Sequence, residues 1–114
     1  MRNSSRLFLP IVAFALFSGS ALFLARSIQQ SKHHSVILTW HPSIPTNGVP
    51  IAEYNVYRST ISGGHYVKIG SRVPDVRFTD SLVRNGTIYF YVVTAVDQHN
   101  RESNYSEEAR AVIP

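Results

Sequence analysis

The chain has 114 residues, with eleven Lys and Arg, seven Asp and Glu, and no cysteine. Without cysteine it has neither a disulfide framework nor a cysteine-based metal centre, and its length leaves room for only one small domain. Beyond Arg2 and Arg6, nine of the eleven basic residues are scattered along the chain, so the composition indicates no nucleic-acid partner.

Residues 7–25 form a segment without a single charge, and a short basic N-terminus precedes it. As a helix with a rise of about 1.5 Å per residue, this segment is roughly 28 Å long, close to the hydrocarbon thickness of a bilayer. Arg2 and Arg6 favour a cytoplasmic position for the residues before it. We therefore expect a cytoplasmic N-terminus at 1–6, a transmembrane helix at 7–25 and an extracytoplasmic remainder, as in a single-pass membrane protein.

The same segment also fits a cleaved signal. Its first part is a hydrophobic stretch of suitable length, and Ser18, Gly19 and Ser20 are small residues of the kind that a signal peptidase requires. Cleavage would leave a periplasmic or secreted protein. The length of the segment favours the membrane anchor, and the cleaved signal remains the alternative.

Residues 26–34 are polar and read as a tether or a short first strand, and a two-residue period begins at Ser35. Val36, Leu38 and Trp40 fall on one face of the strand that this period predicts. The turn-forming residues of Pro42–Pro50 end it.

Further strands are predicted along the rest of the chain. Ile51–Ser59 is followed by a turn at Ser62–Gly64, where glycine tolerates a positive φ, and then by short strands at Tyr66–Ile69 and Arg77–Asp80. The longest β run is Thr87–Asp97, and Ser106–Ile113 forms the closing strand. Short strands separated by turns, with no helical period, predict an all-β antiparallel sandwich over residues 35–114.

Three stretches of this domain resemble the fibronectin type III family. These are the tryptophan strand Val36–Trp40, the Tyr54-Asn-Val56 strand, and Val83–Tyr89 leading into Tyr91, Val93 and Ala95. The resemblance implies an immunoglobulin-like sandwich in which Tyr89 occupies the tyrosine corner. Only Ser27–Lys32 could supply the family's first strand, so we expect the edge beside Val36–Trp40 to be poorly covered.

The period and the resemblance together predict the core. Trp40 is large enough to fill the space between two sheets, and the inward residues of the long strand pack around it. The expected core residues are Val36, Leu38, Trp40, Tyr54, Val56, Val83, Tyr89, Tyr91, Val93 and Ala95.

No pattern in the chain indicates catalysis. His33, His34 and His41 do not have the spacing of a metal site, and the acidic residues form no recognisable catalytic pair. A sandwich domain of this size seldom encloses a dry pocket. We expect no enzyme activity, no catalytic residue, no bound metal and no cofactor.

The outward face of the long strand is the expected contact surface. Tyr57, Phe90 and Val92 have the parity opposite to the core and form an apolar stripe of the kind that binds partners. Arg101 lies in a polar loop at one end of the sandwich, where function is often found. The alternative is cross-strand pairing that only stabilises the sheet.

These features predict a non-enzymatic, membrane-anchored protein-binding or adhesion module that acts outside the cytoplasm, with a protein partner or a second copy of itself. One alternative is a carbohydrate-associated accessory module, because Tyr57 and Tyr66 could stack on a glycan and the resembled family often accompanies glycan-degrading enzymes. Another alternative is a secreted structural domain after signal cleavage.

Overall fold

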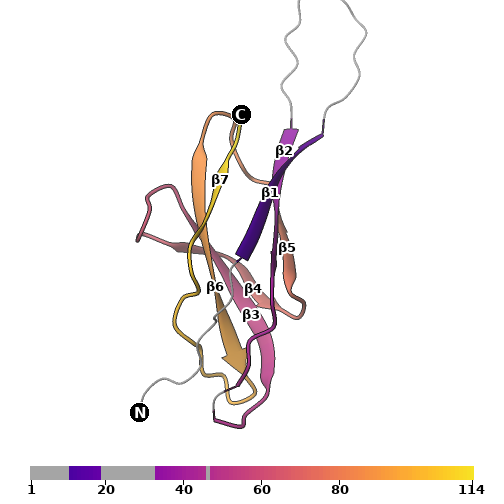
Figure 1. The fold of residues 1–114 in the computed structure, drawn as a ribbon, viewed down its shortest axis with the longest axis vertical. Coiled ribbons are helices and arrows are strands. Elements are labelled where there is room, and N and C mark those ends of the chain that lie inside the picture. Colours follow the sequence, from indigo (N-terminus) through magenta and orange to yellow (C-terminus); the bar gives the residue numbers. More distant parts are fainter. Residues whose placement is uncertain (1–10, 19–32, 46) are drawn as a thin grey trace, which may run out of the picture.

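The computed structural model describes residues 11–18, 33–45 and 47–114, and these form two facing antiparallel β-sheets (Figure 1). One sheet has the strand order β1-β2-β5, and the other has the order β4-β3-β6-β7. Among the described residues, no helix is long and apolar enough to cross a membrane. The strands are β1 (Ile11–Ser18), β2 (His33–Trp40), β3 (Ile51–Ser59), β4 (Val67–Val73), β5 (Arg77–Asp80), β6 (Ile88–Asp97) and β7 (Ala109–Val112).

The first strand differs from the sequence expectation. A transmembrane helix was expected over residues 7–25, but Ile11–Ser18 pairs antiparallel with β2, from Ile11 opposite Trp40 to Ser18 opposite His33. The other residues of the expected helix, and the alternative first strand Ser27–Lys32, lie outside the described residues. Isoleucine, valine and phenylalanine suit a strand, and the open edge of β2 offers unpaired backbone groups. β1 therefore covers the edge that we expected to be bare, and it also contacts β7.

The remaining strands lie close to their expected positions. β3 and β5 have the expected bounds, whereas β2 begins earlier, so that His33 and His34 belong to a strand rather than to a tether. β7 is shorter than expected because Ser103 and Ser106 replace part of its backbone pairing with β6. Their N–H groups donate to the carbonyls of Ala95 and Val93, and their hydroxyls accept from the N–H groups of the same two residues.

The core lies between the sheets, around the residues that the period of two placed there. Trp40 and Tyr54 meet edge to face, with ring centroids 5.5 Å apart. The hydroxyl of buried Tyr89 accepts a hydrogen bond of 3.0 Å from the Arg84 N–H, as a tyrosine corner requires. Val83 is only partly buried and packs against the cluster. The buried members expected from the sequence are Val36, Leu38, Trp40, Tyr54, Val56, Tyr89, Tyr91, Val93 and Ala95.

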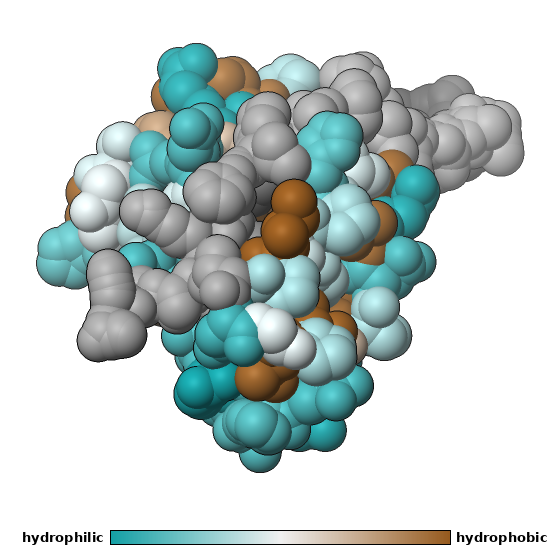
Figure 2. Space-filling view, turned by 60° about the horizontal axis from the view of Figure 1, so that its bottom comes forward, coloured by the Kyte–Doolittle hydropathy of each residue, from teal (hydrophilic) through white to brown (hydrophobic). Residues whose placement is uncertain are grey.

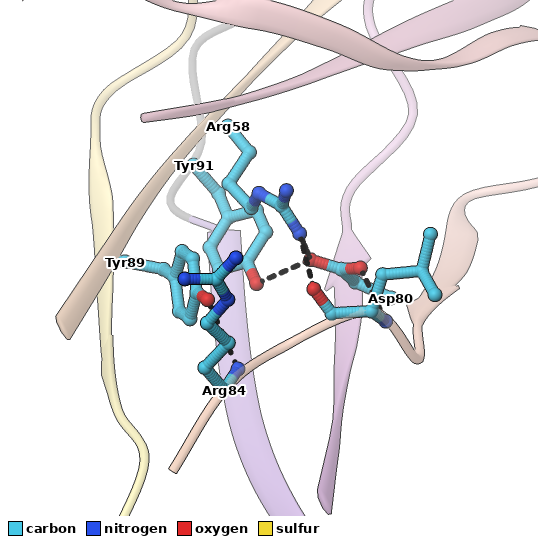
Figure 3. Close-up of polar contacts among 6 residues, drawn as sticks. Arg58, Asp80, Arg84, Tyr89 and Tyr91 are labelled. Atoms are coloured by element: carbon cyan, nitrogen blue, oxygen red, sulfur yellow. Dashed lines mark hydrogen bonds and ion pairs between the residues drawn. The ribbon is translucent and has the colours of Figure 1, made fainter. Parts of the chain in front are cut away.

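A buried carboxylate joins the two sheets (Figure 3). Asp80 on β5 is 4% exposed, and its Oδ2 accepts bonds of 2.8 Å from Arg58 Nη1 on β3 and from the Tyr91 hydroxyl on β6. Its Oδ1 accepts from the Leu82 N–H at 3.1 Å. Burial, followed by the hydrogen bond to Asp80, raises the pKa of Tyr91, so this phenol remains a donor. We call these groups the Asp80 cluster.

Much of the outer surface is hydrophilic. In Figure 2, which turns the lower end of Figure 1 toward the viewer, apolar residues occur as small groups among hydrophilic ones. Surface apolar residues in small groups are ordinary for a folded domain and do not mark a binding face by themselves. A functional surface must therefore be sought in a specific arrangement of side chains.

Gly70 allows the two sheets to approach each other beside Phe78. A Cβ added to Gly70 on β4 would lie 2.6 Å from Phe78 Cε1 on β5. We predict that Gly70→Ala lowers the free energy of unfolding by about 1–3 kcal/mol, because the ring must move out of a packed position. Urea denaturation measures this change.

Gly64→Ala is the matched control, because a Cβ there has no atom within 4 Å. Adding Phe78→Leu to Gly70→Ala should restore part of the lost stability. The prediction is wrong if Gly70→Ala is as stable as the control.

Candidate functional site

Three tyrosines form a continuous row on the outer side of the four-stranded sheet. Tyr57 comes from β3, Tyr66 directly precedes β4, and Tyr105 lies between β6 and β7. The ring centroid of Tyr105 is 5.2 Å from that of Tyr57 and 5.0 Å from that of Tyr66, with interplanar angles of 72° and 69°. Tyr105 is 50% exposed. We call these three residues the tyrosine row.

Local structure explains why the three rings meet. The alternation along β3 turns Tyr57 away from the core residue Val56. The turn after β3 uses positive φ at Gly63 (86°) and His65 (58°) and so returns the chain to Tyr66. Ser103 and Ser106 hold the segment that carries Tyr105 along β6.

A carboxylate fixes each outer ring of the row. Oε2 of Glu102 accepts hydrogen bonds from Thr94 Oγ1 at 2.6 Å, from Asn55 Nδ2 at 3.1 Å and from the Tyr57 hydroxyl. An isolated bridge between Glu102 and Val96 brings this residue against β6.

Glu108 holds the other end of the row. Its carboxylate accepts from Ser62 Oγ at 2.7 Å, from the Gly63 N–H at 2.8 Å and from the Tyr66 hydroxyl. The two outer phenols are therefore anchored, while the central ring of Tyr105 is held by its two edge contacts.

The protonation states follow from these contacts. Burial, followed by the hydrogen bond to a carboxylate, raises the pKa of Tyr57 and of Tyr66 to about 12. Burial opposes ionisation of Glu102 and Glu108, but the hydrogen bonds that they accept outweigh it and lower the pKa of both carboxyls. At neutral pH, the phenols are donors and the carboxylates are charged acceptors.

Two hollows adjoin Glu102. The first, of about 330 Å³, is lined by Tyr57, Tyr105, Asn104 and other polar groups. The second, of about 240 Å³, is lined by Asn55, Lys68 and Arg72 among others. Hydroxyl, amide, carboxylate and aromatic groups thus line one stretch of surface. This combination suits a ligand with many hydroxyl groups and apolar C–H faces.

The residues expected to bind a partner fall into different environments. Tyr57 belongs to the tyrosine row, and Phe90 is half-buried on β6. Val92 is only 1% exposed, so its expected role as a contact residue is wrong. It lies beside its register partner Tyr57, whose much larger side chain shares the same face.

Arg101 is exposed but serves the structure of its loop. Its Nε donates to Asp97 Oδ2 at 2.9 Å, and the Asp97 carboxylate also accepts from the N–H groups of His99 and Arg101. Burial opposes ionisation of Asp97, but these hydrogen bonds outweigh it and lower the pKa of the carboxyl. The loop that leads into Glu102 is therefore held in place by hydrogen bonds among its own residues.

Sequence reasoning did not find Tyr105, Glu102 or the role of Glu108. Tyr57 and Glu102 are separated by 45 positions, and Tyr66 and Glu108 by 42, so no local spacing relates them. Among the expected histidines, His34 is buried, with Nδ1 2.9 Å from Asn85 Oδ1. In the part of the chain that the structure describes, no group of three His, Cys, Asp or Glu residues could hold a metal ion.

Curated relatives resemble this chain over part of its length. It is 52% identical over 58 residues to an amylopullulanase from Thermoanaerobacter thermohydrosulfuricus, and 40% identical over 81 residues to an amylopullulanase from Thermoanaerobacterium thermosulfurigenes. These matches cover 51% and 71% of this chain but only 4% of each relative. The chain is therefore similar to a short segment of large proteins.

No protein-family model matches the chain. Among solved structures, the fold is similar to that of an Fn3-like protein from Clostridium thermocellum, with a TM-score of 0.60 and 39% sequence identity. The match covers 70% of this chain and 77% of that protein. This identity and coverage, together with the two-sheet fold and the tyrosine corner, show that the chain belongs to the Fn3-like (fibronectin type III-like) family.

Proposed function

We propose that this chain is a non-catalytic, carbohydrate-associated accessory module that binds an α-glucan at the tyrosine row. The observation that carries the proposal is the row itself, in which three tyrosines lie beside a charged carboxylate on an open surface. The relatives support a glucan ligand, since the matching segments belong to proteins named amylopullulanase.

The geometry suits sugar binding. Aromatic rings bury the C–H faces of pyranose rings, while carboxylate and amide groups bond to the hydroxyls. The bonds from Asn55, Tyr57 and Thr94 all reach Oε2 of Glu102, so within the described residues Oε1 remains available to a ligand. The rings of the row are tilted by 72° and 69°, which favours a coiled α-glucan over a flat β-1,4-glucan ribbon.

A membrane-anchored adhesion module has less support. Val92 is buried, and Ile11–Ser18 forms a strand. An extracytoplasmic location is part of our proposal on sequence grounds, namely the charge-free segment 7–25 behind a basic N-terminus.

One prediction from this proposal concerns Tyr105, the central ring of the row. Tyr105→Ala should weaken binding to pullulan and amylose about fivefold, since a stacked aromatic ring contributes about 1 kcal/mol. Affinity electrophoresis with each polysaccharide in the gel measures the change, and carboxymethylcellulose serves as the flat-chain comparison.

Ile44→Ala is the matched control, because Ile44 is 69% exposed and is not part of the row. Thermal unfolding should remain cooperative in both variants. Failure of the unmodified protein to bind pullulan and amylose would overturn the proposal, as would equal binding by Tyr105→Ala.

Another prediction from this proposal concerns the pH dependence of binding. The pKa of Glu102 is lowered from 4.5, so the stabilisation that its carboxylate provides is complete above that value and is lost as pH falls through the lower, folded value. Glucan binding should therefore persist to pH 4.5 and decline on further acidification. Binding measured across this range should be weaker in Glu102→Gln and less dependent on pH.

Glu107→Gln provides the comparison, because Glu107 is exposed and its side chain takes no part in the row. An identical acid decline in Glu102→Gln and in the unmodified protein would show that another group controls binding.

A further inference from the structure

A third hollow lies beside the Asp80 cluster and is distinct from the tyrosine row. It measures about 450 Å³, and its lining includes Arg58, Arg84 and His65 but no acidic residue. Tyr57 and Arg58 are neighbours on β3, so their side chains leave opposite faces of the sheet. We call this site the arginine hollow; a ligand there would leave the tyrosine row open.

The charges around the arginine hollow are unbalanced. Arg58 Nη1 donates to Asp80 Oδ2 at 2.8 Å and to the Leu82 carbonyl at 3.0 Å, so its charge is already paired. Arg84 is exposed and forms no ion pair with any described residue. The Asp80 carboxylate therefore balances the charge of Arg58 alone, and a carboxylate from a ligand would balance that of Arg84.

Arg84 is well placed to receive that carboxylate. Its backbone N–H donates to the Tyr89 hydroxyl at 3.0 Å, which fixes the start of its side chain. Figure 3 shows Arg58, Arg84 and Tyr89, which all line the hollow, and the Arg58 Cζ lies 4.9 Å from the centroid of the Tyr89 ring. The planar fork of donors of an arginine suits a bidentate carboxylate.

The rest of the lining indicates what carries the carboxylate. Ile61, Val67 and Leu82 are 54%, 65% and 81% exposed and offer aliphatic surface. Tyr89 is only 4% exposed, so this hollow presents no open aromatic face on which a sugar could stack. Aliphatic side chains next to a carboxylate are a property of peptides rather than of glycans.

We propose that the arginine hollow binds an acidic, aliphatic peptide segment of a partner protein, with a carboxylate on Arg84 and apolar side chains against Ile61, Val67 and Leu82. The module then holds a protein at one face while its tyrosine row is free for another ligand. This site does not depend on the proposed glucan site, because the two share no residue.

The test is an NMR titration of the whole ¹⁵N-labelled chain with the peptide acetyl-Leu-Asp-Leu-Glu-Leu-amide. Its neutral counterpart, with Asn and Gln in place of Asp and Glu, is titrated in parallel. We expect the acidic peptide to shift amide signals around Ile61, Val67 and Leu82, and the neutral peptide to bind at least about tenfold more weakly, because the ion pair is missing. Added salt should weaken the acidic peptide's binding.

Two variants of the hollow and one control variant test the site, and all three keep the side chains of Asp80, Arg58 and Tyr91. Arg84→Gln should reduce the acidic peptide's affinity about tenfold, whereas Arg110→Gln, at an exposed arginine on β7, should leave it unchanged. Leu82→Ala should also weaken peptide binding, while the affinity of all three variants for pullulan stays the same.

The proposal is overturned if both peptides bind equally, if neither binds at millimolar concentration, or if Arg84→Gln binds as well as the unmodified chain. It is also overturned if oligogalacturonate shifts the amide signals around the hollow and the acidic peptide does not, since the occupant would then be a uronate glycan.

Discussion

The register of β3 against β6 is the constraint on which both candidate surfaces depend. It sets Tyr57 opposite Val92 and Arg58 opposite Tyr91. Since neighbouring residues of a strand face opposite ways, this register directs Arg58 toward Asp80 and Tyr57 toward Glu102. A slip of the register by one residue would exchange the faces on which Tyr57 and Arg58 lie. It would place a guanidinium group where the tyrosine row has an aromatic ring.

The Asp80 cluster opposes such a slip. A carboxylate that is only 4% exposed is costly to bury unless its partners are in place, and here an arginine, a phenol and a backbone N–H meet it. The carboxylate lies on β5 of one sheet, and the arginine and the phenol lie on β3 and β6 of the other, so the cluster is satisfied in one arrangement of the sandwich. A purely apolar contact at this position would tolerate more than one arrangement.

The sequence predicted those parts of the molecule that depend on a pattern within a single strand. Alternation of apolar residues located β3, β5 and β6 and the burial of Trp40 and Tyr89, since a period of two is visible within one strand. The tyrosine row has no such signal, because Tyr105 and Glu102 come from irregular segments and meet β3 only after folding. Ile11–Ser18 lies in a charge-free run whose length suits a membrane-spanning helix, whereas its pairing as a strand depends on the edge of β2, which is distant in sequence.

If glucan binds as we propose, the tyrosine row also limits how tightly it can be held. Its outer rings are fixed by Glu102 and Glu108, so their ordering costs little on binding, and Tyr105 contributes the main exposed face. One exposed ring and one available carboxylate oxygen support modest affinity. The matching segments occupy 4% of far longer relatives. Under our proposal, a weak site is useful when it raises the local concentration of the ligand for a linked protein. The two proposed sites are compatible in this respect, because a protein bound at the arginine hollow leaves the tyrosine row open to glucan.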